Sequence, residues 1–229
     1  MGLAAIQPTR AEENRPKPPE TTLSPDKRYG ITVPASFTME NSWAADNQLI
    51  EMKTGQVLGS INSDEPAFAR MNHSELLPAW WSADDTSLLW QVAGKWGMET
   101  QMLVRLKDSQ IQWQLDVIKV LQREILTRTE QADPDRFLAA KKENSGSGSA
   151  YPEKFVFDSQ PEGWNKGPLK FPVRFHVYLT SNCKGAENVP EVDSSMEATL
   201  NEDGRIKVTE FKMGRTKSSP WYKLQTSQW

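Results

Sequence analysis

Alternation of apolar and polar residues is clearest near the end of the chain, in the segment LKFPVRFHVYLT at residues 169–180. Every second side chain from Phe171 to Leu179 is apolar. A period of two places these side chains on one face of a strand, so the segment predicts a half-buried antiparallel strand. Two further strand-like segments, SSMEATL and RIKVTEFKM, are joined by Asn201-Glu202-Asp203-Gly204, and the Asp-Gly pair predicts a hairpin.

A different period runs through residues 110–128, where apolar side chains recur at steps of three and four. These positions are Trp113, Val117, Ile118, Leu121 and Ile125. The spacing predicts an amphipathic helix over 110–128, with Asp108 or Ser109 as its N-cap and with its apolar face packed against a sheet. Asp133 followed by Pro134 predicts a second helix, because aspartate caps a helix start and proline fits the first turn.

Short apolar runs in the first half of the chain predict strands. A strand in RYGITVP is expected to stop at Pro34, and the other runs lie at residues 49–52, 57–61, 80–92 and 102–106. Lys53-Thr54-Gly55 predicts a hairpin between the first two of these, because glycine accepts the positive φ of a tight turn. The simplest arrangement is a four-stranded antiparallel meander.

Three features of this region occur in a fixed order. Ser24-Pro25-Asp26 precedes the first strand, the Lys-Thr-Gly hairpin follows, and Trp81-Ser82-Ala83-Asp84 precedes a later strand. This order resembles the repeating blade of TolB-like and WD40-like β-propellers, and the likeness covers residues 24–106. The arrangement as a whole is similar to hairpin–helix–hairpin proteins of bacteria, many of them exported.

The resemblance implies a structural motif and no activity. Its Ser and Asp side chains are expected to cap the turn backbone, while proline presets the backbone angle φ. The two copies begin 58 residues apart, whereas a WD40 blade repeats at about 40–45 residues. A propeller needs at least about four blades. The resemblance therefore implies one blade-like sheet instead of a closed propeller.

These patterns predict an α+β protein. A blade-like antiparallel β-meander with a packed amphipathic helix is followed by a second antiparallel β-sheet. The expected organisation is a flexible N-terminal tether at 1–22, the blade-like sheet with two helices at 23–144, a Ser/Gly linker or loop at 145–150, and a C-terminal antiparallel β region at 151–229.

Composition narrows the classes of function. The 229 residues include 27 Lys and Arg against 30 Asp and Glu, a formal charge of −3, so the basic stripe expected of a nucleic-acid protein is missing. No run of 18 apolar residues occurs, and no membrane span is expected. Cys183 is the only cysteine, which excludes an intramolecular disulfide and a thiolate metal cluster.

The first residues leave the compartment open. Leu3 to Ile6 form a short run of small and apolar residues before a polar, proline-bearing segment. One interpretation is the end of a secretory signal, although a charged n-region and a full apolar h-region are missing; the other is a disordered N-terminus. The expected location is periplasmic or secreted, with the cytoplasm as the alternative.

Residues with catalytic chemistry are few. The only histidines are His73 and His176, and a dyad of His176 with Cys183 is not expected, because SNCKG reads as a turn and seven residues separate the pair. A hydrolase acting on a glycan or peptide would have to use Asp84, His73 and Glu75. No nucleotide-binding glycine motif is present, and we expect no cofactor, no metal and no catalytic residue.

Nine tryptophans are unusual for this length. Most are expected in the core. Trp80 and Trp81 are adjacent, so a strand would point them to opposite faces, and one is expected to be exposed. The expected partner-binding residues are Trp80, Trp81 and Trp96. The sequence thus favours a non-catalytic, extracytoplasmic binding module for a protein or glycan partner over a hydrolase, and it leaves the oligomeric state open.

Overall fold

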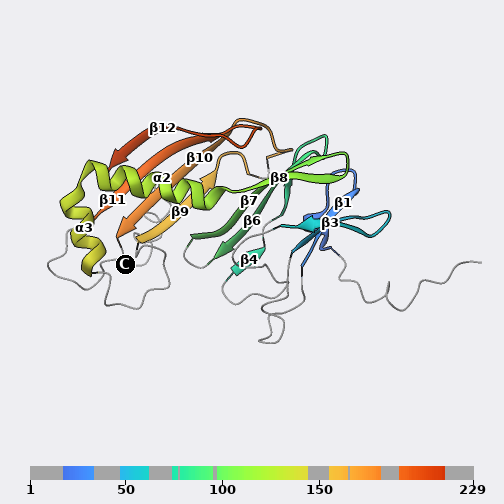
Figure 1. Cartoon of the computed structure of the whole chain (residues 1–229), viewed down its shortest axis with the longest axis horizontal. Coiled ribbons are helices and arrows are strands. Elements are labelled where there is room, and N and C mark those ends of the chain that lie inside the picture. Colours follow the sequence, from blue (N-terminus) through green and yellow to red (C-terminus); the bar gives the residue numbers. More distant parts are fainter. Residues whose placement is uncertain are drawn as a thin grey trace, which may run out of the picture.

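The computed structural model of the chain describes residues 18–33, 47–61, 74–76, 78–94, 97–143, 155–164, 166–181 and 191–214. These residues form three antiparallel sheets and two α-helices. Figure 1 shows the sheets one after another along the long axis of the molecule. The predicted α+β class is confirmed at this level, and the strand arrangement differs from the prediction in the ways described below.

The first sheet contains β1 (Tyr29–Thr32), β2 (Gln48–Glu51) and β3 (Gln56–Ser60) in the order β1-β2-β3, after a short 3-10 helix η1 (Glu20–Thr22). The predicted Lys-Thr-Gly hairpin joins β2 to β3. Gly55 has a φ of +69° and its N–H donates to the carbonyl of Glu51 at 2.8 Å. The hairpin prediction is therefore confirmed.

The second sheet has five strands. They are β4 (Ser74–Leu76), β5 (Trp80–Trp81), β6 (Ser87–Gly94), β7 (Gly97–Lys107) and β8 (Gln110–Asp116). The order is β4-β6-β7-β8, and β5 also pairs with β6. The prediction that these strands form a single four-stranded meander is wrong, because β2 and β3 belong to the first sheet and do not pair with the strands of the second sheet. Ile31 and Leu49 of the first sheet instead share a buried cluster with Leu88 and Val104 of the second.

The helix predicted over 110–128 begins later than expected. Residues 110–116 are strand β8, and helix α2 spans Val117–Ala132. Asp108 and Ser109, predicted as caps, both have positive φ, of 50° and 58°, and form the tight turn between β7 and β8. The N-cap is Asp116, whose carboxylate accepts a hydrogen bond from the backbone N–H of Lys119 at 3.1 Å.

The predicted buried face of the first helix and the predicted start of the second helix are both confirmed. Val117, Leu121 and Ile125 on α2 have no exposed surface. Helix α3 spans Pro134–Glu143, and Asp133 before it accepts a hydrogen bond from the N–H of Arg136.

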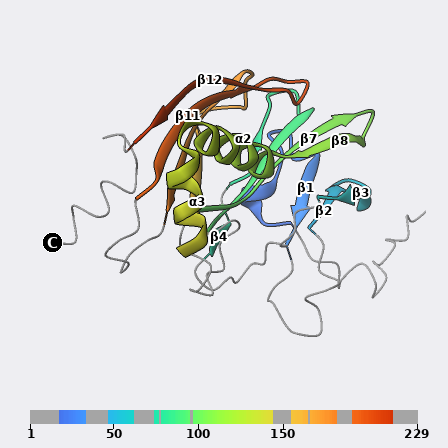
Figure 2. The same ribbon diagram turned by 60° about the vertical axis from the view of Figure 1, so that its left-hand side comes forward.

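The third sheet contains β9 (Phe155–Pro161), β10 (Val173–Ser181), β11 (Asp193–Leu200) and β12 (Ile206–Met213) in the order β12-β11-β10-β9. The alternation predicted for β10 and the turn predicted at 201–204 are confirmed, with Gly204 at a φ of +80°. Helix α2 lies against one face of this sheet (Figure 2).

Two buried clusters hold these layers together. The helix-side cluster lies among α2, the third sheet and one face of the second, and includes Leu89, Leu121 and Phe175. The N-terminal cluster lies between the first sheet and the other face of the second, and includes Ile31 and Trp90. Residues 145–150 lie outside the described residues, and the helix-side cluster contains residues from both sides of that expected boundary.

Candidate functional site

The face of the third sheet opposite α2 is polar, and we call it the outer face. Along β10 the burial alternates strictly: Phe175, Val177 and Leu179 are buried, while the intervening side chains are partly exposed. The period of two that buries one face necessarily turns the other to solvent.

A β-bulge brings the third strand into this face. The register shifts between Glu197 and Ala198 of β11, so that Glu197 pairs with Glu210 and Ala198 pairs with Val208. Thr209 is the extra residue, and its hydroxyl donates to the carbonyl of Glu197 at 3.2 Å. If β12 continued past Val208 as a regular strand, with Thr209 paired and no bulge, strict alternation would turn Glu210 inward.

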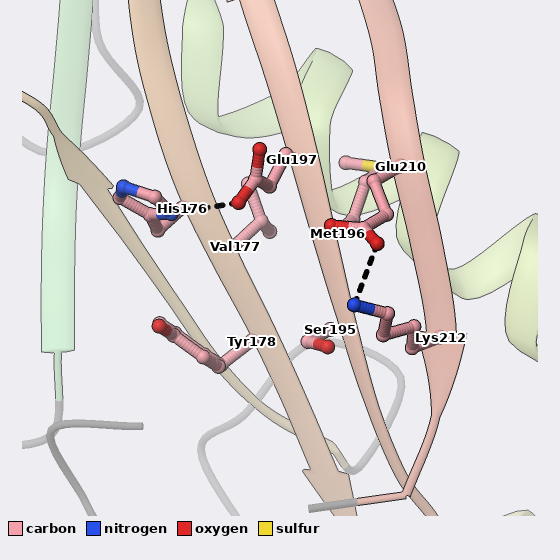
Figure 3. Close-up of a pocket in the computed structure, with 8 residues that line it drawn as sticks. All are labelled: His176, Val177, Tyr178, Ser195, Met196, Glu197, Glu210 and Lys212. Atoms are coloured by element: carbon pink, nitrogen blue, oxygen red, sulfur yellow. Dashed lines mark ion pairs between the residues drawn. The ribbon is translucent and has the colours of Figure 1, made fainter. Parts of the chain in front are cut away.

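The three strands enclose a small hollow, shown in Figure 3. Its volume is about 90 Å³, and its polar lining comes from His176 and Tyr178 on β10, Ser195 and Glu197 on β11, and Glu210 and Lys212 on β12. Pockets that enclose small molecules usually measure about 300–1,000 Å³. This hollow is therefore suited to one group protruding from a larger partner.

Four titratable side chains in the hollow lie in two pairs. Nδ1 of His176 lies 3.7 Å from Oε1 of Glu197, and Lys212 Nζ contacts Oε1 of Glu210 (Figure 3). The hydrogen bond from Lys212 to Glu210 raises the pKa of the Lys212 ammonium above its usual range. Outside the hollow, at the first residue of β11, burial raises the pKa of Asp193. The lining thus offers hydrogen-bond donors and acceptors of both charges.

No group of three or more metal-binding side chains that could hold a metal ion occurs among the described residues. His176 and Glu197 form a pair, and within the part of the chain that the structure describes no third ligand joins them. The chemistry that this lining supports is hydrogen bonding and charge pairing with a polar partner.

The two turns that carry the propeller resemblance have the same hydrogen bonds. In the first, the Ser24 hydroxyl donates to Asp26 and accepts from the N–H of Tyr29; in the second, Ser82 does the same with Asp84 and Ser87. The predicted capping is confirmed in both copies. Hydrogen bonding to Ser82 also lowers the pKa of Asp84.

The expectation that one ring of the tryptophan pair is exposed is wrong. Trp80 and Trp81 point to opposite faces, as predicted, but they are only 8% and 3% exposed. Trp80 belongs to the helix-side cluster and Trp81 to the N-terminal cluster, because both faces of the second sheet are covered. Trp96, the third expected partner residue, has no described structure.

The pair is also fixed by hydrogen bonds to distant segments. The indole N–H of Trp80 donates to the carbonyl of Gly167 at 2.8 Å, and that of Trp81 donates to Thr22 at 3.2 Å. Trp164 packs edge-on against Trp80, with ring centroids 5.3 Å apart.

Two of the three residues expected of a hydrolase, Asp84 and Glu75, lie far apart on the second sheet. Asp84 caps the turn that opens β6, whereas Glu75 on β4 pairs with Ala93 near the other end of β6. A strand rises about 3.3 Å per residue, so roughly 20 Å of β6 separates them. His73 and Cys183 lie outside the described residues, so the His176–Cys183 dyad and the third member of the hydrolase set have no described geometry.

The lining residues Glu197, Glu210 and Lys212 were not predicted as site residues. The sequence of β12 does contain a signal for this arrangement. Its apolar residues stand at even positions up to Val208 and at odd positions from Phe211, so the alternation shifts by one residue between them. Such a phase change within a strand indicates a bulge.

Comparison with protein-family models, with curated proteins and with solved structures finds no match to this chain. Among the described helices, none combines the length and the apolar character needed to cross a membrane.

Proposed function

We propose that this protein is a non-catalytic binding module whose outer face takes a polar partner, a protein or a glycan. The observation that carries the proposal is the hollow formed by β10, β11 and β12, with donors and acceptors side by side on a rigid sheet. Its lining needs no rearrangement of secondary structure to meet a partner, because the opposite face of the same sheet is fixed by the helix-side cluster.

A matched pair of lysine variants on β12 tests this function. Lys212 lines the hollow, whereas Lys207 is exposed on the same strand and pairs with Thr199 outside it. Binding to a glycan array and to candidate extracellular proteins is measured for the wild type, Lys212→Ala and Lys207→Ala. We expect Lys212→Ala to weaken a detected interaction at least about tenfold, the loss of one charge-assisted hydrogen bond, and Lys207→Ala to leave it unchanged. Equal effects of the two variants would contradict binding in the hollow.

The proposal includes a periplasmic or secreted location, which rests on the resemblance to exported bacterial proteins. Fractionation of producing cells tests the location directly. Turnover of a glycan or peptide substrate by the purified chain would overturn the non-catalytic part of the proposal and support the hydrolase alternative.

A further inference from the structure

The polar side chains that line the hollow form two rows across the three strands. The strand register places one residue of β10, one of β11 and one of β12 in each row. Neighbouring strands lie about 4.8 Å apart, and rows two residues apart are separated by about 6.6 Å along the strands. The acceptor row consists of His176, Glu197 and Glu210, and the donor row consists of Tyr178, Ser195 and Lys212 (Figure 3).

The two rows differ in the hydrogen bonds that they offer. Glu197 and Glu210 are directly opposite each other, and their carboxylate oxygens only accept. In the other row, the Lys212 ammonium only donates and the Ser195 hydroxyl can do both. Two hydrogen bonds of about 2.8 Å each span about 5.6 Å, which is close to the row separation of about 6.6 Å. A group between the rows must therefore donate on one side and accept on the other, as a hydroxyl does.

The charges of the hollow already have partners within it. Lys212 contacts Glu210, and Nδ1 of His176 lies 3.7 Å from Oε1 of Glu197. An ammonium carries three N–H donors and a carboxylate about four acceptor sites, so these contacts leave capacity for a ligand. When His176 is neutral, two carboxylates stand against one ammonium. The lining therefore favours a neutral ligand over an anionic one.

Two rings bound the hollow on its β10 side. His176 and Tyr178 lie two residues apart on the same face of β10, and both are partly exposed. Planar rings offer a flat, partly apolar wall against which C–H groups can pack. Val177 and Met196, which are buried in the helix-side cluster, complete the floor and keep the rows in a fixed register. A sugar ring has this combination of C–H groups and hydroxyl groups.

A protein partner fits the outer face less well. Protein interfaces have few charged residues at their centre, and a small number of large buried side chains supply most of the binding energy. In the part of the chain that the structure describes, the exposed large hydrophobic residues are Met52, Val57 and Leu138, and none of them lies on the third sheet.

Given the binding function proposed above for the outer face, we propose that its partner is a glycan, and that a neutral sugar unit places its hydroxyl groups between the acceptor row and the donor row. One sugar unit in a shallow hollow makes few contacts, so a dissociation constant of about 1 mM is expected for a monosaccharide.

NMR titration of the labelled wild type tests this assignment. The probes are the methyl glycosides of glucose, galactose and mannose, and a disaccharide of each. At least one of them should shift the backbone amides of the two rows in a saturable manner. Saturable shifts confined to other parts of the chain, or no saturable shift with any of the probes, would overturn the assignment.

The charge of the ligand gives a second measurement. The methyl glycoside that binds best is compared with the corresponding uronic acid, in which a carboxylate replaces the terminal hydroxymethyl group. Repulsion from Glu197 and Glu210 should make the uronic acid bind at least about threefold more weakly. Equal or tighter binding of the uronic acid would contradict a site for a neutral sugar.

A matched pair of glutamate variants locates this selectivity. Glu197→Gln keeps the shape of the side chain but removes its charge, so it should weaken the neutral glycoside at least about threefold and bring its affinity close to that of the uronic acid. Glu210→Gln repeats the test at the opposite residue. Glu162→Gln is the control, because Glu162 is exposed and pairs with Arg174 outside the hollow. The control should keep the wild-type selectivity, and equal changes in all three variants would contradict the acceptor row.

The result also separates the glycan from the binding function itself. If the sugars fail to bind while a protein partner loses affinity in Lys212→Ala, the glycan assignment is overturned and the binding function of the outer face stands. If neither sugars nor proteins bind there, both are overturned.

Discussion

Strand β6 in the second sheet and strand β10 in the third differ in what covers them. On β6, Leu88 and Leu89 are both fully buried, because the first sheet covers one face and the helix-side cluster the other. On β10, Phe175 is fully buried and its neighbour His176 is partly exposed. Two antiparallel sheets in one chain therefore have different tolerance to substitution.

The difference assigns the two sheets different roles. A sheet covered on both faces has no surface left for a partner, so its aromatic side chains are structural. A sheet covered on one face can present polar side chains in a fixed register. This explains why binding is proposed at the hollow of the third sheet and not at the tryptophan pair.

The strongest test of the doubly covered sheet uses Trp80 and Trp81. Trp80→Ala and Trp81→Ala should each lower the free energy of unfolding by about 3–5 kcal/mol, the cost of removing a buried Trp. Denaturant unfolding measures both. If either variant kept wild-type stability, that face of the second sheet would have to be open.

On β10, alanine substitutions at two neighbouring residues should lower the free energy of unfolding by unequal amounts. Phe175→Ala removes a fully buried ring and should cost about 3–5 kcal/mol. His176→Ala, on the outer face, should stay within about 0.5 kcal/mol of the wild type. Equal losses for the two variants would contradict a sheet with one solvent-facing side.

A smaller effect is expected where the third sheet touches the second. Gly204, in the β11–β12 turn, has positive φ, and a Cβ there would lie 3.1 Å from Cη2 of Trp113 on β8. Gly204→Ala should cost about 1–2 kcal/mol from backbone strain and this contact. Thermal unfolding of Gly163→Ala gives the control.

Gly163 has nearly the same φ, +79°, and a Cβ at this residue would meet nothing within 4 Å. Its substitution should show the backbone strain alone, and the excess for Gly204→Ala reports the contact with Trp113. Equal losses of stability in the two variants would mean that a side chain at residue 204 makes no unfavourable contact with Trp113 of β8.

Local patterns predicted three of the four strands of the third sheet and the start of α3, whereas strand β9 was not predicted. The alternation in β10, the Asp203-Gly204 turn and the Asp133-Pro134 start of α3 all depend on neighbouring residues, and all were confirmed. The Ser-x-Asp turns belong to the same group, since their hydrogen bonds span five residues at most.

The beginning of α2 was misplaced because two periods overlap. Trp113 and Val117 fit a helical step of four, while Ile111, Trp113 and Leu115 fit a strand. The decisive feature was the turn before them, in which Asp108 and Ser109 adopt positive φ without a glycine. Side chains other than glycine give a much weaker sequence signal for such a turn.

Features that depend on distant residues were not predicted. Trp80 and Trp81 are covered by layers built from distant parts of the chain, and their indole N–H groups donate to Gly167 and Thr22. A period of two specifies opposite faces, but it does not specify whether another layer covers each face.

The two buried clusters also differ in the order in which synthesis completes them. The described residues of the N-terminal cluster run from Tyr29 to Ile111, so a chain that has emerged from the ribosome to that point already contains all of them. The buried residues of the helix-side cluster run from Trp80 to Leu200, so the last of them is synthesised about 120 residues after the first. Helix α2 can pack against β7 as soon as it forms, but the rest of its apolar face stays uncovered until the strands of the third sheet, residues 155–213, have been made. During this interval chaperone binding or aggregation would compete with folding.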